Sequence, residues 1–288
     1  MSSGPDSHAT MAPVSAGADR GWLHVTVCGE VSLARADGDP RPVRGRQPQV
    51  VVAHLAVTGG RVHREQLADA LWGEHVSDHW PGALRGVLSK VRAALVEVGL
   101  PPTSLRSEGA VVWLDVPAGV RTDLGDASAA VQAASEASAA GDHDEVLRTI
   151  GPARVTLARP FLLHNDSHWS RVQRDEIDAL AARAMHQQVT ALLATGQSAT
   201  GVSVARAAVA ERPLDEVAHH LLIEVLLADG QRARAVQALS ELTELLAVEL
   251  GIAPAEATVA LLRPVERAAE DTRSRSARPA DDTPFVGR

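Results

Sequence analysis

Two histidines in the stretch HNDSH have the spacing that metal-binding histidines use on a helix. His164 and His168 lie four residues apart, so both imidazoles could reach one metal ion if they shared a helix face. The three residues between them, Asn165, Asp166 and Ser167, are of the types that cap the start of a helix. We therefore expect the two histidines to lie on either side of a helix start, and we predict no metal site.

The other reactive side chains do not form a recognisable catalytic set. Cys28, the only cysteine, lies in an apolar stretch and is interpreted as a small core residue. His219 and His220 are adjacent and would point in different directions on a helix. Asp215 and Glu216 follow a proline and are interpreted as first-turn acids that complement a helix dipole. The sequence also has no recognisable Ser, His and Asp set, and we predict that the chain is not an enzyme.

A phosphate-binding loop of the Walker type is not present in the sequence. Such a loop needs a lysine directly after a glycine, and the single lysine, Lys90, follows Ser89 inside a predicted helix. We expect no cofactor in this chain.

The remaining candidate functional side chains are cationic. They lie on a predicted helix over residues 82–98, GALRGVLSKVRAALVEV. Its larger apolar side chains form one stripe that must face a core. The stripe consists of Leu84, Val87, Leu88, Val91, Ala94, Leu95 and Val98. The opposite face has a floor of small residues with cations along its edges. The floor is Gly82, Gly86, Ser89 and Ala93, with Arg85 and Arg92 on one side and Lys90 on the other.

A small floor between cations suits a helix that enters the major groove of DNA. Gly86 costs about 1 kcal/mol relative to alanine inside a helix, and a close approach of the backbone to another surface would explain it. Arg85, Ser89 and Arg92 would then face bases, while Lys90 would contact phosphates. The alternative is an ordinary solvated helix face that happens to be basic.

Composition limits the overall organisation. The 288 residues are 45% hydrophobic, enough for two domains with a core each, and the formal net charge is −8. Residues 20–122 hold twelve Arg or Lys against ten Asp or Glu, whereas residues 123–288 hold sixteen against twenty-four. One cysteine favours a reducing cytoplasm, and no apolar run reaches the roughly 18 residues of a membrane span. We expect a cytoplasmic protein with no membrane partner, whose first part is the one suited to nucleic acid.

The first part shows a sequence of elements typical of one small fold. Residues 23–35 alternate around Gly29 as two short strands, residues 48–58 and 63–73 are helical, and residues 104–116 read as a hairpin after the helix over 82–98. The order of two strands, three helices and a hairpin predicts a winged helix-turn-helix.

The second part has continuous helical periodicity from residue 124 to about 269. The turn ATGQ at 194–197 recurs as ADGQ at 228–231, an offset of 34 residues, and AAGDHDEV at 139–146 is a further turn between helices. This offset is the tetratricopeptide period. We predict a mainly α chain with a small β component: a disordered tail over 1–20, a winged helix over 21–121, an all-α array over 122–270 and a linker over 271–288.

Both parts resemble one known family. The stretch LADALWGE, followed by ALRGVLSKVRAAL and a hairpin, is similar to the OmpR-like DNA-binding domain of the SARP (Streptomyces antibiotic regulatory protein) activators. The stretches PFLLHNDSHWSRVQRDEIDALAARA, ERPLDEVAHHLLIEVLLADGQRARAVQAL and LLAVELGIAPAEATVALL resemble the bacterial transcriptional activation domain of the same family. The resemblance covers residues 22–268. It implies an activator of a secondary-metabolite gene cluster that binds direct repeats in promoter DNA as a homodimer and recruits RNA polymerase.

The resemblance also implies which residues contact RNA polymerase, and the hairpin of this chain departs from the family's pattern. It implies that the loop between the second and third helices touches polymerase, with Glu74, Asp78 and Trp80 as the contact residues, although Trp72 beside it is interpreted as a core anchor. The family's hairpin ends in Gly-Tyr-Arg-Leu, where this chain has Val-Val-Trp-Leu at 111–114, so a basic wing contact is lost. Two cations remain as phosphate contacts outside the third helix: Arg106 on the hairpin and Arg64.

The last five residues, PFVGR, resemble the entry into a nucleotide-binding domain, where ATP would bind in a longer parent protein. The alternative to an activator is a tetratricopeptide-type interaction scaffold whose winged domain does not bind DNA.

Overall fold

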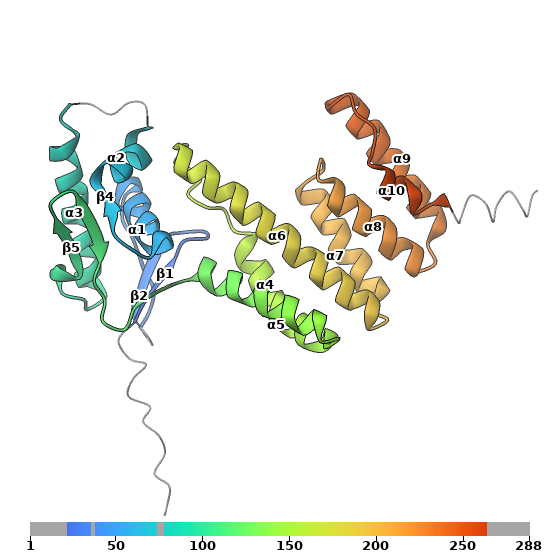
Figure 1. Ribbon diagram of the computed structural model, residues 1–288, viewed down its shortest axis with the longest axis horizontal. Coiled ribbons are helices and arrows are strands. Elements are labelled where there is room, and N and C mark those ends of the chain that lie inside the picture. The colour runs from blue at the N-terminus through green and yellow to red at the C-terminus, as the bar shows by residue number, and fades with distance from the viewer. Residues whose placement is uncertain (1–21, 36–37, 74–77, 264–288) are drawn as a thin grey trace, which may run out of the picture. The chain divides into compact units, whose positions relative to one another are not determined.

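The computed structural model describes residues 22–35, 38–73 and 78–263 (Figure 1). The predicted tail over 1–20, the linker over 271–288 and the PFVGR stretch lie outside these residues. The chain forms two compact units, Met1–Ser128 with Thr156–Ile177 and Ala129–Val155 with Asp178–Arg288. The units are not continuous in sequence, and the domain boundaries predicted from the sequence stay a prediction.

The first unit begins with a four-stranded sheet. Strands β1 (Leu23–Thr26) and β2 (Ser32–Arg35) pair antiparallel around Gly29, as predicted from their alternation. Two further strands, β3 (Arg41–Pro42) and β7 (Val120–Thr122), lie outside them in the order β3-β2-β1-β7, with β7 parallel to β1. Neither strand was predicted from the sequence, because strands of two or three residues are too short to show a period.

Three helices follow the first three strands. Helix α1 (Arg46–Thr58) ends at Gly59, whose left-handed backbone (φ 66°) lets its N–H donate to the Leu55 carbonyl oxygen at 3.1 Å. Helix α2 spans Arg64–Trp72 and helix α3 spans Trp80–Glu97. Seven consecutive residues of α1, from Val50 to Ala56, are buried, so α1 is the central helix against which both α2 and α3 pack.

A β-hairpin follows α3 and forms the wing. A short 3-10 turn (Pro102–Ser104) leads into β5 (Leu105–Glu108), which pairs antiparallel with β6 (Val111–Leu114). The two-residue strand β4 (Val62–His63) adds to the other edge of β6, so the sheet order is β4-β6-β5. The predicted winged helix-turn-helix is therefore confirmed, and β4 ties the wing to the start of α2.

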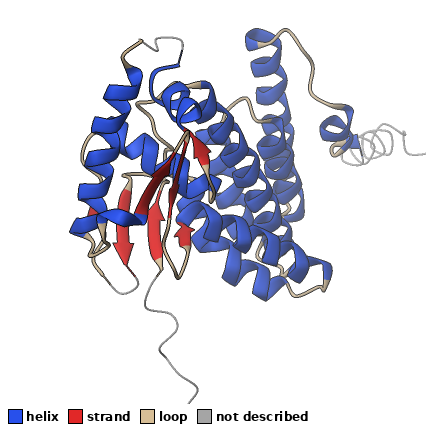
Figure 2. Ribbon diagram, turned by 60° about the vertical axis from the view of Figure 1, so that its left-hand side comes forward, coloured by secondary structure: helices blue, strands red, loops and turns tan. Residues whose placement is uncertain are grey.

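The described chain after β7 is helical apart from its connecting turns and loops, and Figure 2 draws its helices in blue. The helices are α4 (Asp123–Ala139), α5 (His143–Leu157), α6 (His168–Ala194), α7 (Ser198–Glu211), α8 (Glu216–Ala228), α9 (Arg232–Glu249) and α10 (Glu256–Ala260). The expected all-α array is confirmed.

The 34-residue repeat corresponds to two turns with the same backbone geometry. Gly196 and Gly230 have left-handed φ values of 71° and 74°. The next residue of each turn donates its backbone N–H to a carbonyl oxygen of the preceding helix. Gln197 donates to Leu192 O at 2.7 Å, and Gln231 donates to Leu226 O at 2.8 Å. Both turns are Schellman-type helix ends that start the second helix of a pair.

The helix pairs bury a common core of leucine, valine and alanine side chains around α8. Gly201 marks the closest approach, because a Cβ placed there would lie 3.2 Å from Val225 Cγ1 and 3.8 Å from Leu192 Cβ. Ser198 Oγ also donates to Asp229 Oδ1 at 2.7 Å and so joins the two repeat turns. No helix in the described ranges has the length and apolar character needed to cross a membrane.

Candidate nucleic-acid interface

Helix α3 has the two faces expected from its sequence. Its buried residues are Leu84, Val87, Leu88, Val91 and Leu95. Two further members of the predicted stripe, Ala94 and Val98, are only half-buried because they lie at the edge of the contact with the rest of the winged fold. The stripe anchors α3 and leaves its opposite face to solvent.

The opposite face is open along its length. Gly82, Gly86, Ser89 and Ala93 are exposed, as are the cations Arg85 and Lys90. A Cβ added at Gly86 would meet no atom within 4 Å, and the same is true at Gly82. Packing within the described chain therefore gives no reason for glycine at residue 86, which lies in the interior of an 18-residue helix.

Two cations on α3 are available for an external partner. The Arg85 side chain is exposed and folds back along the helix, where its Nε donates to the Pro81 carbonyl oxygen at 3.2 Å. Because that acceptor is neutral and close to solvent, the guanidinium keeps its charge and most of its donors. Lys90 is exposed, and its ammonium has no ion pair with any residue that the structure describes.

The third cation of the helix has a different environment from the one expected. Arg92 is half-buried, and its Nη2 donates to the Leu105 carbonyl oxygen at 3.4 Å, at the start of β5. The contact joins the recognition-helix candidate to the wing. Sequence spacing placed Arg92 on the same edge as Arg85, but it could not show that the hairpin returns to that edge.

The two cations expected to contact phosphates also have partners inside the winged fold. Arg64, half-buried at the start of α2, donates from Nη2 to Ser107 Oγ at 2.6 Å, while its buried Nε has no hydrogen-bond partner. Arg106 pairs with Asp115 across the hairpin, with 3.0 Å between Nε and Oδ2 and both side chains about half exposed. These contacts hold the wing, and part of the Arg106 charge is neutralised.

A further cation, which was not predicted from the sequence, lies against the wing. The guanidinium of Arg61 stacks over the Trp113 ring at 4.2 Å from its centroid. The pairing of β4 with β6, with Val62 opposite Val112, brings these two residues together. Arg61 directly follows the Gly59-Gly60 helix stop, and only the strand pairing could have revealed its position.

The loop between α2 and α3 is described only in part. Glu74 lies outside the described residues. Asp78 is exposed, and Trp80 is the half-buried first residue of α3 instead of a loop residue. Trp72, expected as a core anchor, is also half-buried, at the end of α2.

The predicted separation of the two histidines is confirmed. Helix α6 begins at His168, and His164 lies before it in the chain. Between them, Asn165 Oδ1 accepts hydrogen bonds from Ser167 Oγ at 2.6 Å and from Ser170 Oγ at 2.5 Å. In the part of the chain with described coordinates, no cluster of three His, Cys, Asp or Glu side chains could hold a metal ion.

The remaining reactive residues have structural surroundings. Cys28 is buried, and burial raises the pKa of its thiol to about 12, with the Asp123 carboxylate adding to the effect. Asp215 caps α8 by accepting from the Val217 and Ala218 amides at 3.0 and 3.3 Å. His219 is buried, and its Nε2 lies 2.9 Å from the Pro213 carbonyl oxygen.

One buried histidine was not singled out from the sequence. His54 of α1 is 5% exposed and stacks on Trp169, with 4.3 Å between ring centroids. Phe161 meets the same indole edge-on at 5.7 Å. Burial lowers the pKa of His54 to about 4, so the ring is neutral at physiological pH.

These features define a class of protein: a winged helix whose third helix exposes a small, cation-edged face, joined to an all-α array of tetratricopeptide type. Residues 122–265, half of the chain, match the family of the bacterial transcriptional activator domain. The chain belongs to this family, and the combination with a winged helix is that of the SARP regulators.

Named relatives agree with this assignment. The chain is 28% identical over 237 residues to the regulatory protein AfsR of Streptomyces coelicolor, covering 82% of this chain and 23% of AfsR. It is 26% identical over 282 residues to AfsR of Streptomyces griseus, covering 96% of this chain and 27% of that protein. The chain thus spans about a quarter of the length of these relatives, both of which are named as regulatory proteins.

A solved structure shares the fold. Mycobacterium tuberculosis EmbR, determined in complex with a low affinity phosphopeptide, matches with a TM-score of 0.75 and 23% sequence identity. The match covers 88% of this chain and 69% of EmbR. At this identity the likeness establishes the common architecture alone.

Proposed function

We propose that the chain is a sequence-specific transcription activator that inserts the exposed face of α3 into the major groove of promoter DNA. The open space around Gly86 carries the proposal, because no contact within the described chain requires glycine there. A backbone without side chains can sink toward base edges, and the cations beside it can then reach bases and phosphates.

The contacts of each cation refine the proposed roles. Arg85 and Ser89 face bases, and Lys90 contacts a phosphate, because all three are exposed on the open face. Arg92 is proposed to share the base-facing edge while its bond to Leu105 O fixes the wing against α3. Three cations around the wing complete the phosphate contacts: Arg61, Arg64 and Arg106.

The partners proposed for the chain follow from its family. We propose that it binds direct repeats in promoter DNA as a homodimer and recruits RNA polymerase through Glu74, Asp78 and Trp80. We also propose that it is a cytoplasmic protein and that it activates a secondary-metabolite gene cluster. The family match and the two AfsR relatives support this set of partners. No cofactor is proposed for this chain, and ATP is assigned to a nucleotide-binding domain in a longer parent protein.

DNA binding can be tested by fluorescence anisotropy with duplexes from the intergenic DNA upstream of the gene. Arg85→Ala should weaken specific binding by about 5- to 150-fold, since a base contact contributes roughly 1–3 kcal/mol. Lys90→Ala should weaken binding to all sequences and reduce the slope of log affinity against log salt by about one. Arg183→Ala, which removes an exposed arginine from α6, is the matched control and should change neither quantity.

Gly86→Gln tests the close approach directly. The longer side chain has free space in the unbound protein, so the fold should persist, whereas specific DNA affinity should fall at least about tenfold because the side chain blocks the groove. Ala207→Gln, at an exposed small residue of α7, is the control. If the wild-type chain binds no upstream duplex, or if all three α3 variants bind like the wild type, the proposal is wrong.

One observation favours the alternative of an interaction scaffold. Three of the expected DNA-contacting arginines, Arg64, Arg92 and Arg106, already have hydrogen-bond partners inside the winged fold. A scaffold needs those contacts only for stability. In that case the α3 variants would leave DNA binding absent or unchanged, while Arg92→Ala would lower stability without any effect specific to DNA.

A further inference from the structure

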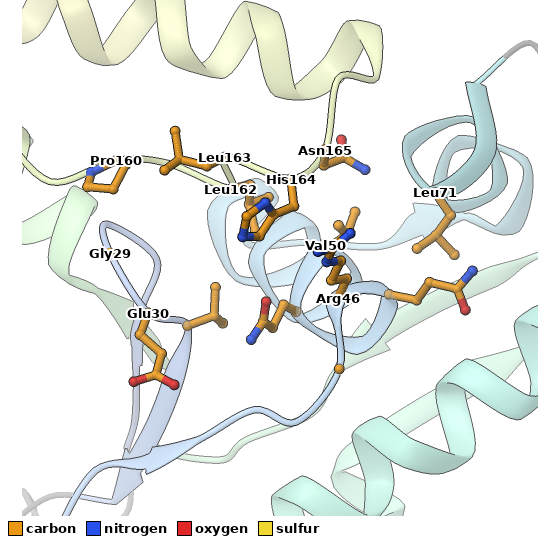
Figure 3. Close-up of a pocket in the computed structure, with 14 residues that line it drawn as sticks. Gly29, Glu30, Arg46, Val50, Leu71, Pro160, Leu162, Leu163, His164 and Asn165 are labelled. Carbon is orange, nitrogen blue, oxygen red and sulfur yellow. The ribbon is translucent and has the colours of Figure 1, made fainter.

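The first compact unit contains a cavity that the proposed function does not use. Its volume is about 560 Å³, within the roughly 300–1,000 Å³ of typical small-molecule sites. Its walls are the β1–β2 turn, the start of α1, the end of α2 and the chain segment 160–165 (Figure 3). Every lining residue belongs to this one unit.

The inner wall of the cavity is apolar. Val31, Val50 and Leu162 line it and are themselves buried, and Leu71 adds a half-buried side chain from α2. Leu163, also in the lining, is 63% exposed. A ligand with an apolar body would remove this side chain from water.

The rim of the cavity carries one strong cation and several neutral polar groups. Arg46, the first residue of α1, is exposed, and no residue in the described ranges forms an ion pair or hydrogen bond with its guanidinium. Gln47 and His164 are exposed in the same lining. A guanidinium binds a carboxylate with two parallel hydrogen bonds, the geometry that it fits best.

The single acid in the lining does not cancel this cation. Glu30 is exposed on the β1–β2 turn, and in Figure 3 its carboxylate points away from Leu162 and His164. Glu30 and Arg46 form no ion pair. The electrostatic preference at the mouth is therefore for an anion near Arg46.

The segment that forms the upper wall is fixed before any ligand binds. Asn165 Nδ2 donates to the Ala70 carbonyl oxygen at 2.8 Å and ties the segment to α2. Arg174 donates from its two terminal nitrogens to the carbonyl oxygens of Leu162 and Asn165 at 3.3 and 2.9 Å. A preformed wall costs little conformational entropy when a ligand enters.

We propose that this cavity binds a small amphipathic carboxylate, with its apolar body against Val50 and Leu162 and its carboxylate on Arg46. The site is separate from the α3 face and does not depend on the proposed DNA binding. A bound ligand would contact the winged helix and the segment 160–165 at once, and would stabilise the unit that contains both.

Three probes of equal chain length test the chemistry: octanoate, octan-1-ol and octylammonium. Isothermal titration calorimetry on the whole 288-residue chain, below the aggregation concentration of each probe, should show octanoate binding at least about tenfold tighter than the other two, because only it can pair with Arg46. Equal affinity for all three, or no binding of octanoate, would overturn the proposal.

Variants locate the site. Arg46→Gln should reduce octanoate affinity about tenfold and leave octan-1-ol unchanged, whereas Arg44→Gln, which removes an exposed arginine outside the lining, should have less than about a twofold effect. Gln47→Trp should fill the mouth from an exposed position and abolish binding of octanoate, with the melting temperature of the free protein retained.

Methyl NMR gives an independent location. Octanoate should shift the methyl signals of Val50, Leu162 and Leu163 and leave those of Leu221 and Leu242 in the second unit unchanged. Shifts confined to the second unit, or octanoate binding that Gln47→Trp leaves intact, would show that the cavity is not the site. DNA affinity of Arg46→Gln, measured separately, should match the wild type, so failure here leaves the proposed function untouched.

Discussion

Two glycines in helix interiors, one in each unit, lie in opposite surroundings. Gly201 of α7 is buried where α7 crosses α8, and any side chain there would press on Val225. Gly86 of α3 has empty space where a side chain would stand. The first glycine is explained by packing within the chain. No contact with a described residue explains the second, which is the glycine that the proposed function places in the DNA groove.

The contrast extends to the polar residues of each unit. In the helical unit, polar side chains close turns and cap helices, as Asp215 and Ser198 do. In the winged unit, Arg64 and Arg92 hydrogen-bond to the hairpin, whereas Arg85 and Lys90 on the exposed face of α3 form no ion pair with the residues that the structure describes. An exposed helix face with cations that form no ion pair, and with room beside them, is suited to binding a partner. Polar side chains that are hydrogen-bonded within the fold instead stabilise it.

The largest effect should follow from filling the buried glycine. Gly201→Val adds a branched side chain 3.2 Å from Val225 Cγ1 and should lower the free energy of unfolding by up to about 3 kcal/mol. Urea unfolding followed by circular dichroism measures the change. Gly86→Val is the control at an open site in a helix interior, and an equal loss in both variants would show that β-branching, and not close packing, is the cause.

A second effect comes from the buried histidine of the winged unit. The folded-state pKa of His54, about 4, lies below the ordinary value of 6.5, so the unfolded state binds the proton more readily. The stability that the neutral His54 ring contributes is fully present above pH 6.5 and is lost as the pH falls from 6.5 toward 4. The loss in the free energy of unfolding amounts to about 2 kcal/mol at pH 5. Unfolding titrations between pH 7 and pH 5 measure this loss.

His54→Phe is the matched variant for that titration. It keeps a ring against Trp169 but cannot be protonated, so the fall in stability between pH 7 and pH 5 should shrink by about the same 2 kcal/mol. If the variant loses as much stability on acidification as the wild type, other groups carry the pH dependence.

A smaller effect is expected at the cap of α8. Asp215→Ala removes the acceptor for the Val217 and Ala218 amides and should cost about 1 kcal/mol, whereas Asp215→Asn should restore most of it. Thermal unfolding distinguishes the two variants. Equal stability of both alanine and wild-type proteins would show that the cap is dispensable.

The smallest effect has the opposite sign and sharpens the contrast between the glycines. Gly86→Ala should raise the free energy of unfolding by about 0.5–1 kcal/mol, since alanine is the better helix former and nothing obstructs it. Specific DNA affinity should nevertheless fall. A gain in both stability and affinity would remove the reason proposed for glycine at this residue.

The sequence predicted the periodic features of the molecule well. The buried stripe of α3, the 34-residue offset of the repeat turns and the helix start at His168 all depend on neighbours within one helix or one turn. Such features follow from local geometry and could be recognised without any knowledge of the fold.

Pairings between distant segments could not be predicted in the same way. The strand β4 has two residues, yet its pairing with β6 brings Arg61 over Trp113. The partners of Arg64 and Arg92 lie on β5, which returns to the helices only after folding. The predicted DNA-contact residues stay predictions, and the structure adds which of them have internal partners.

The sequence by itself determined that α3 has an apolar face and a small, cationic face, because helical periodicity places residues three and four apart on one side. Only the tertiary structure decided that Arg85 and Lys90 form no ion pair with any described residue, while Arg92 is hydrogen-bonded to the wing. It alone also brought residues 160–165 against α1 and α2, where together they line a half-open cavity. The physical reason is that contacts between residues far apart in sequence depend on how whole elements pack, and that packing leaves no period in the chain.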